Sequence, residues 1–443
     1  MVVILCCLIS GPVLASETTG AHESGFLPPV VSVTPFILML TSIAVIPLVR
    51  GHWWENNWNK LIISGILGIP MGIYIFFNDF HELLEVLEEY VAFIVYVGSL
   101  FTIAGGIVLR GDIKVSPKVN TLIIGIGAIL ASFIGTPGAA MLLIRPLLRI
   151  NANRTYIKHT VIFFIFLVCN CGGCLTPLGD PPLFLGYLNG VPFQWTFKLW
   201  PEWLFVVSIV LVVYYIWDSY LFRKETGISS QATAQVSQPL RLVGLINFVW
   251  LAGVILSVAF LPIFPYREAV MLSMVAFSLR TTAEGLRDEN KFTYHPIIEV
   301  AFLFIGIFLT MIPALILLEK RGGEFGITEP WQFFWITGSL SAFLDNAPTY
   351  LTFFSLGKGL PLMEPTVAET GVNEFILRGI SLGAVFMGSM TYIGNGPNFM
   401  VKAIADETGI KMPTFLGYMV WSISILIPIF ILNSLIFFVL LGH

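Results

Sequence analysis

The sequence predicts an all-α polytopic membrane protein, and three observations support that fold class. The 443 residues are 56% hydrophobic and only 11% charged, whereas soluble domains contain about 25% charged residues. Apolar runs of about 17–25 residues recur along most of the chain, and each could cross a bilayer core of about 30 Å as a helix. The same kinds of segment then occur a second time in the same order, which predicts a duplicated unit.

Each predicted unit contains five spanning segments, one of them broken, and a pair of short arms that predicts a re-entrant helical hairpin. In the first unit, residues 30–222, the spans are predicted at 30–50, 59–78, 90–109, 155–187 with an interruption, and 200–222, and the hairpin at 119–150. In the second unit, residues 241–443, they are predicted at 241–261, 266–280, 297–318, a broken 375–405, and 415–441, with the hairpin at 330–360. Residues 223–240 are expected to form a cytoplasmic linker.

The N-terminal segment, residues 1–29, begins with the apolar stretch "MVVILCCLISGPVLAS". It ends in small residues, as a signal peptide does, but it lacks a basic start. A cleaved signal peptide over residues 1–15 and an uncleaved segment both stay open.

The two units also match in short motifs. "VAF" occurs at Val91 to Phe93 and at Val300 to Phe302, and "SFIGTPG" (132–138) answers "AFLDNAP" (342–348). "LTPLGDPPLFL" (175–185) answers "MTYIGNGPNFM" (390–400), which pairs Asp180 with Asn395. Because five spans is an odd number, the second copy must be inverted in the membrane, as in many secondary transporters.

Charge predicts the orientation. With the N-terminus outside, most of the 23 Lys and Arg residues fall in cytoplasmic loops, as the positive-inside rule requires. The acidic stretch 78–90 then becomes an exterior loop, and Arg267 falls at the outer edge. We therefore expect a multi-pass membrane protein with both termini on the outer side, periplasmic or extracellular.

The two broken spans share the pattern Thr-x-x-Gly-Asx-x-Pro. Proline removes a backbone donor and glycine permits unusual dihedral angles, so each span should divide into two half-helices near the midplane, where the hairpin tips also arrive. Freed carbonyls suit a cation there, and helix N-termini suit an anion. The residues of this pattern are Thr176, Gly179 and Asp180 in the first unit and Thr391, Gly394 and Asn395 in the second.

Asp345 and Asp180 are the carboxylates expected deep in the membrane. An Asp at the centre of a spanning helix costs about 2.5–3.5 kcal/mol, so it is a functional candidate. Asp345 lies at a hairpin tip beside Asn346, whereas Asp180 has a structural alternative as the N-cap of a half-helix starting at Pro181. Glu299 is either a proton relay or an interfacial anchor.

Other chemistry has weaker support. "CGGC" (171–174) has metal or redox spacing, but its place inside a membrane segment favours a packing role. The six His residues form no zinc motif, and neither a nucleophile set for an enzyme nor a cofactor or nucleic-acid motif is found. A passive channel is disfavoured because broken, inverted repeats indicate alternating access.

These motifs resemble the ion transporter superfamily. "GGCLTPLGDPPLFLGYLNGVPFQWTFKLWPEW" (172–203) is similar to a bacterial branch labelled putative citrate transport, whose members are commonly called sodium:proton antiporters. "SAFLDNAPTY" (341–350) resembles the Asp-Asn-x-Pro hairpin of NhaD-type antiporters and arsenite permeases. The resemblance covers nearly the whole chain from about residue 30.

The resemblance implies a Na⁺ site formed by Asp345, Asn346, Asn395 and Asp180, with hairpin tips at Thr136, Pro137 and Pro348. It also implies a homodimer in the lipid bilayer. The leading expectation is a Na⁺ (or Li⁺)/H⁺ antiporter that needs no cofactor. The alternative is a Na⁺- or H⁺-coupled symporter for citrate, another dicarboxylate or a metal-citrate complex. The Ser-Asn-Thr signatures of dicarboxylate carriers are missing, and no Lys or Arg is expected near the two Asp residues.

Overall fold

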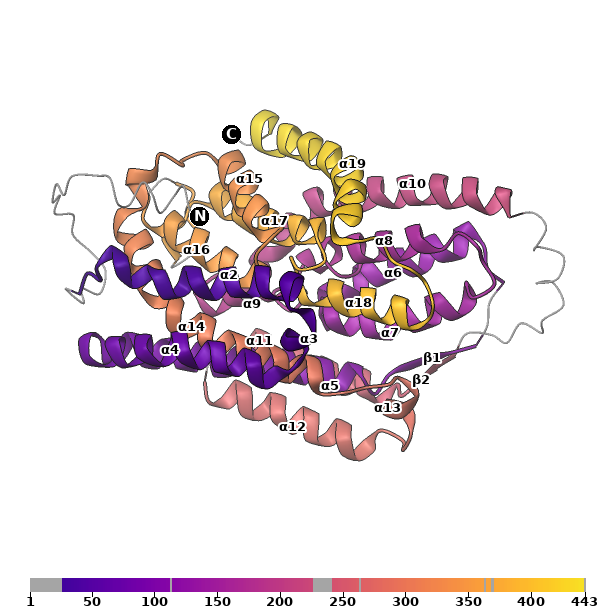
Figure 1. The fold of residues 1–443 in the computed structure, drawn as a ribbon, viewed down its shortest axis with the longest axis horizontal. Coiled ribbons are helices and arrows are strands. Elements are labelled where there is room, and N and C mark those ends of the chain that lie inside the picture. Colours follow the sequence, from indigo (N-terminus) through magenta and orange to yellow (C-terminus); the bar gives the residue numbers. More distant parts are fainter. Residues whose placement is uncertain are drawn as a thin grey trace.

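The computed structural model describes residues 26–111, 114–225, 241–262, 264–361, 364–367 and 370–441. Within these residues the chain is almost entirely helical (Figure 1), and seven helices are long and apolar enough to cross a membrane. The all-α, polytopic fold class is therefore confirmed. The possible signal peptide and residues 226–240 of the linker lie outside the described residues.

Six helices, three from each half of the chain, form what we call the scaffold. Its helices α4 and α14 pack together, α5 packs on both α12 and α14, and α11 packs on α12. These helices are α2 (Thr34–Val49), α4 (Asn57–Asn78), α5 (Phe80–Ala104), α11 (Ile246–Phe260), α12 (Tyr266–Thr281) and α14 (His295–Arg321).

The other long elements form what we call the bundle, most of which lies above α4, α5 and α12 of the scaffold in Figure 1. Its members are α6 (Pro117–Ile134), α7 (Thr136–Ile150), α8 (Lys158–Leu167), α9 (Pro181–Leu188), α10 (Trp200–Lys224), α15 (Pro330–Ser341), α16 (Asn346–Lys358), α17 (Glu374–Met387), α18 (Gly396–Glu407) and α19 (Phe415–Ser434). Every residue of α8 after Lys158 is buried, so the centre of the bundle is the core of the molecule.

Short elements connect these helices. They are η1 (Val30–Val33), α3 (Gly51–Glu55), η2 (Cys171–Cys174), η3 (Phe193–Leu199), α13 (Leu286–Glu289), η5 (Gly322–Phe325), η7 (Gly388–Met390) and the terminal π-helix η8 (Leu435–Leu440). Strands β1 (Val108–Arg110) and β2 (Arg241–Val243) pair antiparallel, with Val108 opposite Val243. This ribbon joins the end of α5 to the start of the second half.

The predicted hairpins and broken spans are present as helix pairs. The arms α6 and α7 pack together and are separated at Gly135, which has a φ of +79°. The arms α15 and α16 also pack together and are separated by residues 342–345. The matching breaks fall between η2 and α9 and between η7 and α18. Equivalent elements make equivalent contacts, because α9 lies on α16 as α18 lies on α7. Inversion of the second unit in the membrane stays a prediction.

The acidic stretch 78–90 is not a loop, contrary to the sequence prediction. It forms the first turns of α5, where the Asp79 side chain accepts a hydrogen bond from the Glu82 backbone N–H at 3.1 Å. Leucine and glutamate have high helix propensity, so this stretch extends the helix. The predicted span at 90–109 accordingly ends early, at Ala104.

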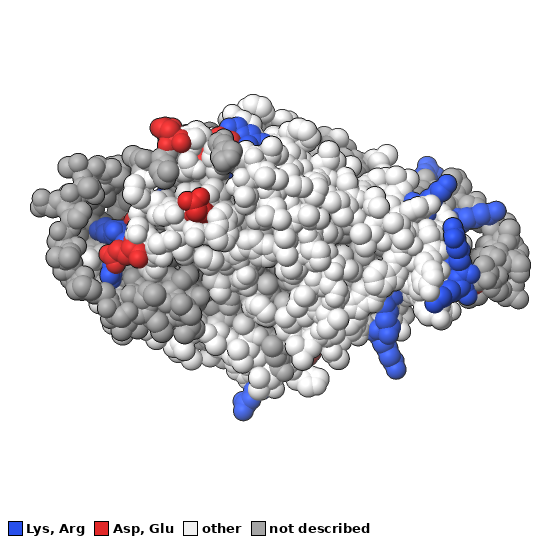
Figure 2. Space-filling model, turned by 90° about the horizontal axis from the view of Figure 1, so that it is seen from above, with Lys and Arg blue, Asp and Glu red and all other residues white. Residues whose placement is uncertain are grey.

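The surface is apolar in its middle and charged at its ends. In the view of Figure 2, most visible acidic side chains lie toward one end, which we call the acidic end. The opposite end shows basic side chains, and we call it the basic end. Large apolar side chains such as Ile66, Ile69 and Ile73 of α4 are more than half exposed. An apolar belt of this extent is unusual on a soluble protein and fits contact with lipid.

Candidate functional site

Asp180 lies at the first break, directly before α9. It is fully buried and has extended dihedral angles, with φ −139° and ψ 144°. Two prolines follow in the first turn of α9, and the Asp180 side chain makes no capping hydrogen bond to that helix. The N-cap alternative is therefore wrong for the carboxylate, although the residue occupies the N-cap position. Both carboxylate oxygens are free to bind other partners.

Three neutral donors from three other elements surround the Asp180 carboxylate. Thr136, the first residue of α7, donates its hydroxyl to Oδ1 at 2.8 Å. Asn395, at the second break, donates its amide to the same oxygen at 2.9 Å, and Asn346 of the second hairpin donates to Oδ2 at 2.6 Å. Both breaks and both hairpin tips thus meet at one buried carboxylate, as the sequence predicted.

The capping role belongs to Asp345 instead. Asp345 precedes α16, and its Oδ1 accepts a hydrogen bond from the Ala347 backbone N–H at 3.1 Å. Its side chain is half-buried, whereas Asn346, the next residue, is buried and holds Asp180. Asp345 is therefore adjacent to the central carboxylate through Asn346, and it also has a structural task that sequence reasoning did not assign.

The two break threonines fasten the hairpins to the broken spans. Thr176 donates its hydroxyl to the Ser132 carbonyl, and Thr391 donates to the Ala342 carbonyl. Each hydroxyl also accepts a backbone N–H two residues on, from Leu178 in one case and from residue 393 in the other. These threonines hold the geometry of the site and do not contact the Asp180 carboxylate in the described network.

Close backbone approach explains the break glycines. A Cβ built on Gly179 would lie 2.1 Å from the Gly173 carbonyl oxygen, and one on Gly394 would lie 2.5 Å from the Gly388 carbonyl oxygen. Gly172 of "CGGC" would similarly meet Ala128 backbone atoms at 2.6 Å. The described cysteines Cys169, Cys171 and Cys174 are buried and form no disulfide with one another, in line with the packing interpretation.

The hairpin prolines begin the second arms. Pro137 lies in the first turn of α7, and Pro348 is buried in the first turn of α16. Proline suits a first turn because the missing N–H has no helical partner there. The backbone N–H of Thr136 donates to the Gly179 carbonyl at 2.8 Å, which fixes the first tip on the first break.

Glu299 does not lie at the Asp180 site. Its carboxylate is 2.8 Å from the ammonium group of Lys60, a side chain only 2% exposed, while Glu299 is 37% exposed. The pair joins α4 to α14 within the scaffold. This contact gives Glu299 an anchoring role, and its use as a proton relay stays a prediction.

A family model described as "Putative citrate transport" matches residues 27–438. The chain belongs to this family. No curated protein matches the sequence. Membership in the citrate transport family, together with the apolar helices, establishes a multi-pass membrane protein of a transporter family.

The structure adds two asparagines that sequence reasoning missed in this member of the citrate transport family. Asn170 donates to the side-chain oxygen of Asn398 at 2.7 Å, and Asn398 donates to the carbonyls of Gly388 and Thr391, both at 2.9 Å. The side-chain oxygen of Asn170 is buried without a hydrogen-bond partner and lies 3.1 Å from the Cβ position of Gly388. Amides inside apolar membrane segments were the signal available in the sequence.

Arg267 bears on the expectation that no Lys or Arg lies near the two Asp residues. It is fully buried, and its guanidinium carbon lies 5.7 Å from the Phe184 ring centroid on α9. Phe184 is one helical turn from Asp180. Glu268 accepts from two Arg267 nitrogens, at 2.9 and 2.7 Å, so this cation is paired. In the part of the chain that the structure describes, the donors to the Asp180 carboxylate are Thr136, Asn346 and Asn395, and none of them is a Lys or Arg.

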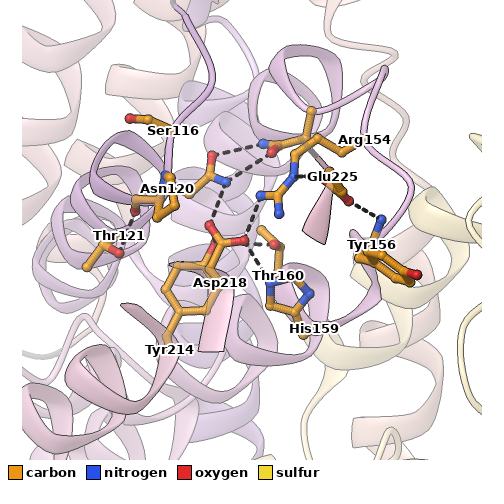
Figure 3. Close-up of polar contacts among 12 residues, drawn as sticks. Ser116, Asn120, Thr121, Arg154, Tyr156, His159, Thr160, Tyr214, Asp218 and Glu225 are labelled. Carbon is orange, nitrogen blue, oxygen red and sulfur yellow. Dashed lines mark hydrogen bonds and ion pairs between the residues drawn. The ribbon is translucent and has the colours of Figure 1, made fainter. Parts of the chain in front are cut away.

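A second buried polar cluster lies between α6, α8 and α10 (Figure 3), and its centre is Asp218. Arg154 donates to Asp218 at 2.6 Å, and His159 Nε2 lies 2.9 Å from the same oxygen. Asn120 and the Tyr214 hydroxyl donate to the other oxygen at 3.2 and 3.3 Å. Asp218 is fully buried. The sequence analysis did not select it because Asp218 comes near the end of a span, where a charge is ordinary.

This cluster ties the loop after the first hairpin to α10. Arg154 also donates to Glu225 at 2.9 Å, and Glu225 accepts the Tyr156 backbone N–H at 2.6 Å. Three elements of the first half therefore converge on two carboxylates at the basic end. The role we assign to the cluster is to hold α6, α8 and α10 as one body.

We expect Asp218→Ala to destabilise the protein strongly. Removing one partner of a buried ion pair leaves the other charge uncompensated, at a cost of about 3–5 kcal/mol. Thermal unfolding in detergent should show a markedly lower melting temperature. The control is Glu324→Ala, which removes a carboxylate that is 58% exposed and paired with Arg321, since exposed pairs contribute about 0–1 kcal/mol. Equal small shifts for both variants would contradict the role of the cluster.

Proposed function

We propose that the protein is a Na⁺/H⁺ antiporter of the bacterial inner membrane, in which Asp180 binds the two ions alternately. The observation behind the proposal is the fully buried Asp180 carboxylate, whose three side-chain partners are a hydroxyl and two amides. A buried carboxylate without a basic partner is stabilised by a proton or a metal cation. One site that accepts either ion, but not both together, couples their movements.

Helix ends support the ionised form of this carboxylate. Helices α7, α9, α16 and α18 begin at Thr136, Pro181, Asn346 and Gly396, so four N-termini converge on the two acidic residues. Each N-terminus carries roughly +0.5 elementary charge. The four N-termini together nearly balance the charge of two ionised carboxylates. A bound Na⁺ would add its positive charge at a place where Asp345 can also be a ligand.

The amides can serve both states. In the structure, Asn346 and Asn395 turn their NH₂ groups toward Asp180, which suits a carboxylate without a cation. Each amide also carries an oxygen, and Na⁺ prefers oxygen ligands. The proposal therefore assigns Na⁺ to the oxygens of Asp180, Asn346, Asn395 and Asp345.

The second candidate is coupled transport of citrate or a related carboxylate. The family description favours it, and four helix N-termini together with two amide groups can attract an anion. Against it, such a substrate would approach two carboxylates, and the buried guanidinium of Arg267, beside Phe184, is paired with Glu268. A bound cation would have to reverse the local sign.

Everted inner-membrane vesicles separate the two candidates. With the interior acidified and a pH-sensitive dye quenched, addition of Na⁺ or Li⁺ should restore the fluorescence if the ions exchange for protons. Addition of choline chloride is the matched control. An absent response to both cations, combined with citrate uptake by the protein in proteoliposomes, would replace the antiporter with the symporter.

A further inference from the structure

Helices α9 and α18 follow equivalent breaks, but only one of them is seated on the scaffold. Helix α9 packs on α5, and α18 makes no comparable contact with α14 among the described residues. Their contacts within the bundle do correspond, since α9 packs on α16 and α17 while α18 packs on α7 and α8. The two halves thus differ in how these two helices contact the scaffold.

Phe184 seats α9. It is fully buried, and its ring stacks on Tyr96 of α5 with centroids 3.7 Å apart. The Tyr96 hydroxyl donates to the Leu178 carbonyl at 2.6 Å, two residues before Asp180. Tyr96 is therefore a positioning residue for the first break.

Two further hydrogen bonds close the same interface toward the acidic end. The Tyr187 hydroxyl donates to the Val258 carbonyl of α11 at 2.5 Å. Asn189, just after α9, donates to Glu89 of α5 at 3.2 Å. Side-chain contacts from Phe184 to Asn189 therefore hold α9 against the scaffold on the side toward the acidic end.

On α18 the equivalent face is open. Phe399, the counterpart of Phe184, is 56% exposed. Gly396 is exposed, and a Cβ added there would meet nothing within 4 Å. Open space therefore reaches the residue next to Asn395.

Charge on α18 indicates that this space holds water. Lys402 and Asp406 form an ion pair at 2.8 Å, and the Lys402 ammonium lies 5.9 Å from the Phe399 ring centroid. Lys402 is seven residues from Asn395, about 10 Å along a helix, while half of the hydrocarbon core is about 15 Å. A charged pair at that depth is costly in hydrocarbon, and this cost supports a path for water that enters from the basic end.

The duplicated sequence indicates which residue of α14 corresponds to Tyr96 of α5. Aligning "VAF" at Val91 to Phe93 with "VAF" at Val300 to Phe302 places Ile305 of α14 where Tyr96 lies on α5. Tyr96 is 2% exposed, whereas Ile305 is half-buried and not covered by α18.

We propose that this structure is the state closed toward the acidic end and open toward the basic end, and that transport exchanges docking of Phe184 on Tyr96 for docking of Phe399 on Ile305. The inference rests on the proposed transport function but not on which ion or carboxylate moves. In the alternate state α9 leaves α5, and the acidic-end path opens.

Two cysteine pairs test the exchange. The test pair is Phe399→Cys with Ile305→Cys, and the matched control pair is Phe184→Cys with Tyr96→Cys, each treated in membrane vesicles with a short bifunctional methanethiosulfonate, which joins two thiols through reducible disulfides. We expect the control pair to cross-link at rest and the test pair to cross-link several-fold more during turnover than at rest. Either cross-link should arrest transport until it is reduced.

Labelling of Phe399→Cys alone with a membrane-impermeant thiol reagent provides a second measurement, in case a double variant fails to fold. We expect labelling from the basic side, in everted vesicles, and little from the other side, with Phe184→Cys protected. Test-pair cross-linking equal at rest and in turnover, or Phe399→Cys protected from the basic side, would overturn the proposal. The cross-linking is measured with Na⁺ and, separately, with citrate as the driving substrate. Turnover-dependent cross-linking with citrate alone would replace the ion assignment and keep the exchange, and its absence with both would overturn the exchange.

Discussion

Replacing Asp180 with asparagine is expected to abolish the Na⁺-evoked release of the proton gradient in everted vesicles while the protein stays folded. The variant keeps the shape of the side chain but loses the charge that a proton or Na⁺ must neutralise. A neutral amide offers neither the negative charge nor the proton-accepting oxygen of the carboxylate, so we expect ion binding to weaken at least ~100-fold, or about 2.8 kcal/mol.

The same hypothesis predicts the direction in which pH changes the apparent Na⁺ affinity of the unaltered protein. Protons and Na⁺ compete for the Asp180 carboxylate, so the Na⁺ concentration for half-maximal response should rise as pH falls, by up to about tenfold per pH unit for one-to-one competition. Glu324→Gln, which removes an exposed carboxylate, is the control and should respond like the unaltered protein. Normal exchange by Asp180→Asn would show that another group carries the ions.

Asp345→Asn is expected to remove exchange with little effect on stability. Asparagine and aspartate are about equally good N-caps, so the variant keeps the start of α16 but loses the carboxylate. Asp345→Ala removes both, and loss of a cap costs about 1 kcal/mol. We therefore expect both variants to be inactive in the vesicle assay, and only the alanine variant to melt earlier.

The pair of variants separates the two roles of Asp345. Activity in Asp345→Asn together with lower stability of Asp345→Ala would leave Asp345 a capping residue alone. Protein amounts in the membrane, compared by immunoblot, exclude a trivial loss of expression. Asn346 lies between Asp345 and Asp180, so this outcome would also leave Asp180 as the acidic ion-binding residue.

The sequence predicted where the breaks lie because Gly, Pro and Asx signals are local. The matching motifs also predicted that Asp180, Asn395 and Asn346 would meet, since equivalent elements of a duplicated unit converge. Side-chain roles were harder, because they depend on partners from distant segments. Asp345, favoured as the central carboxylate, caps α16, and Asp180, suspected of capping, has three donors instead.

The sequence also did not reveal which charged side chains are buried. Arg267 and Asp218 look like ordinary end-of-span charges in the sequence, and only packing shows that both are enclosed. Their partners differ in sequence distance, since Glu268 is adjacent to Arg267 while Arg154 is 64 residues from Asp218. No local pattern identifies the second kind of pair.

The interlocked scaffold bears on how this chain evolved. Helix α4 of the first half packs on α14 of the second, and α12 of the second half packs on α5 of the first, so neither half builds a scaffold alone. A gene encoding a single unit would need two copies of its product, inserted in opposite directions, to form the same interface. Fusion of two such genes would make that antiparallel pairing permanent and let the copies diverge, leaving a carboxylate at Asp180 and an amide at Asn395.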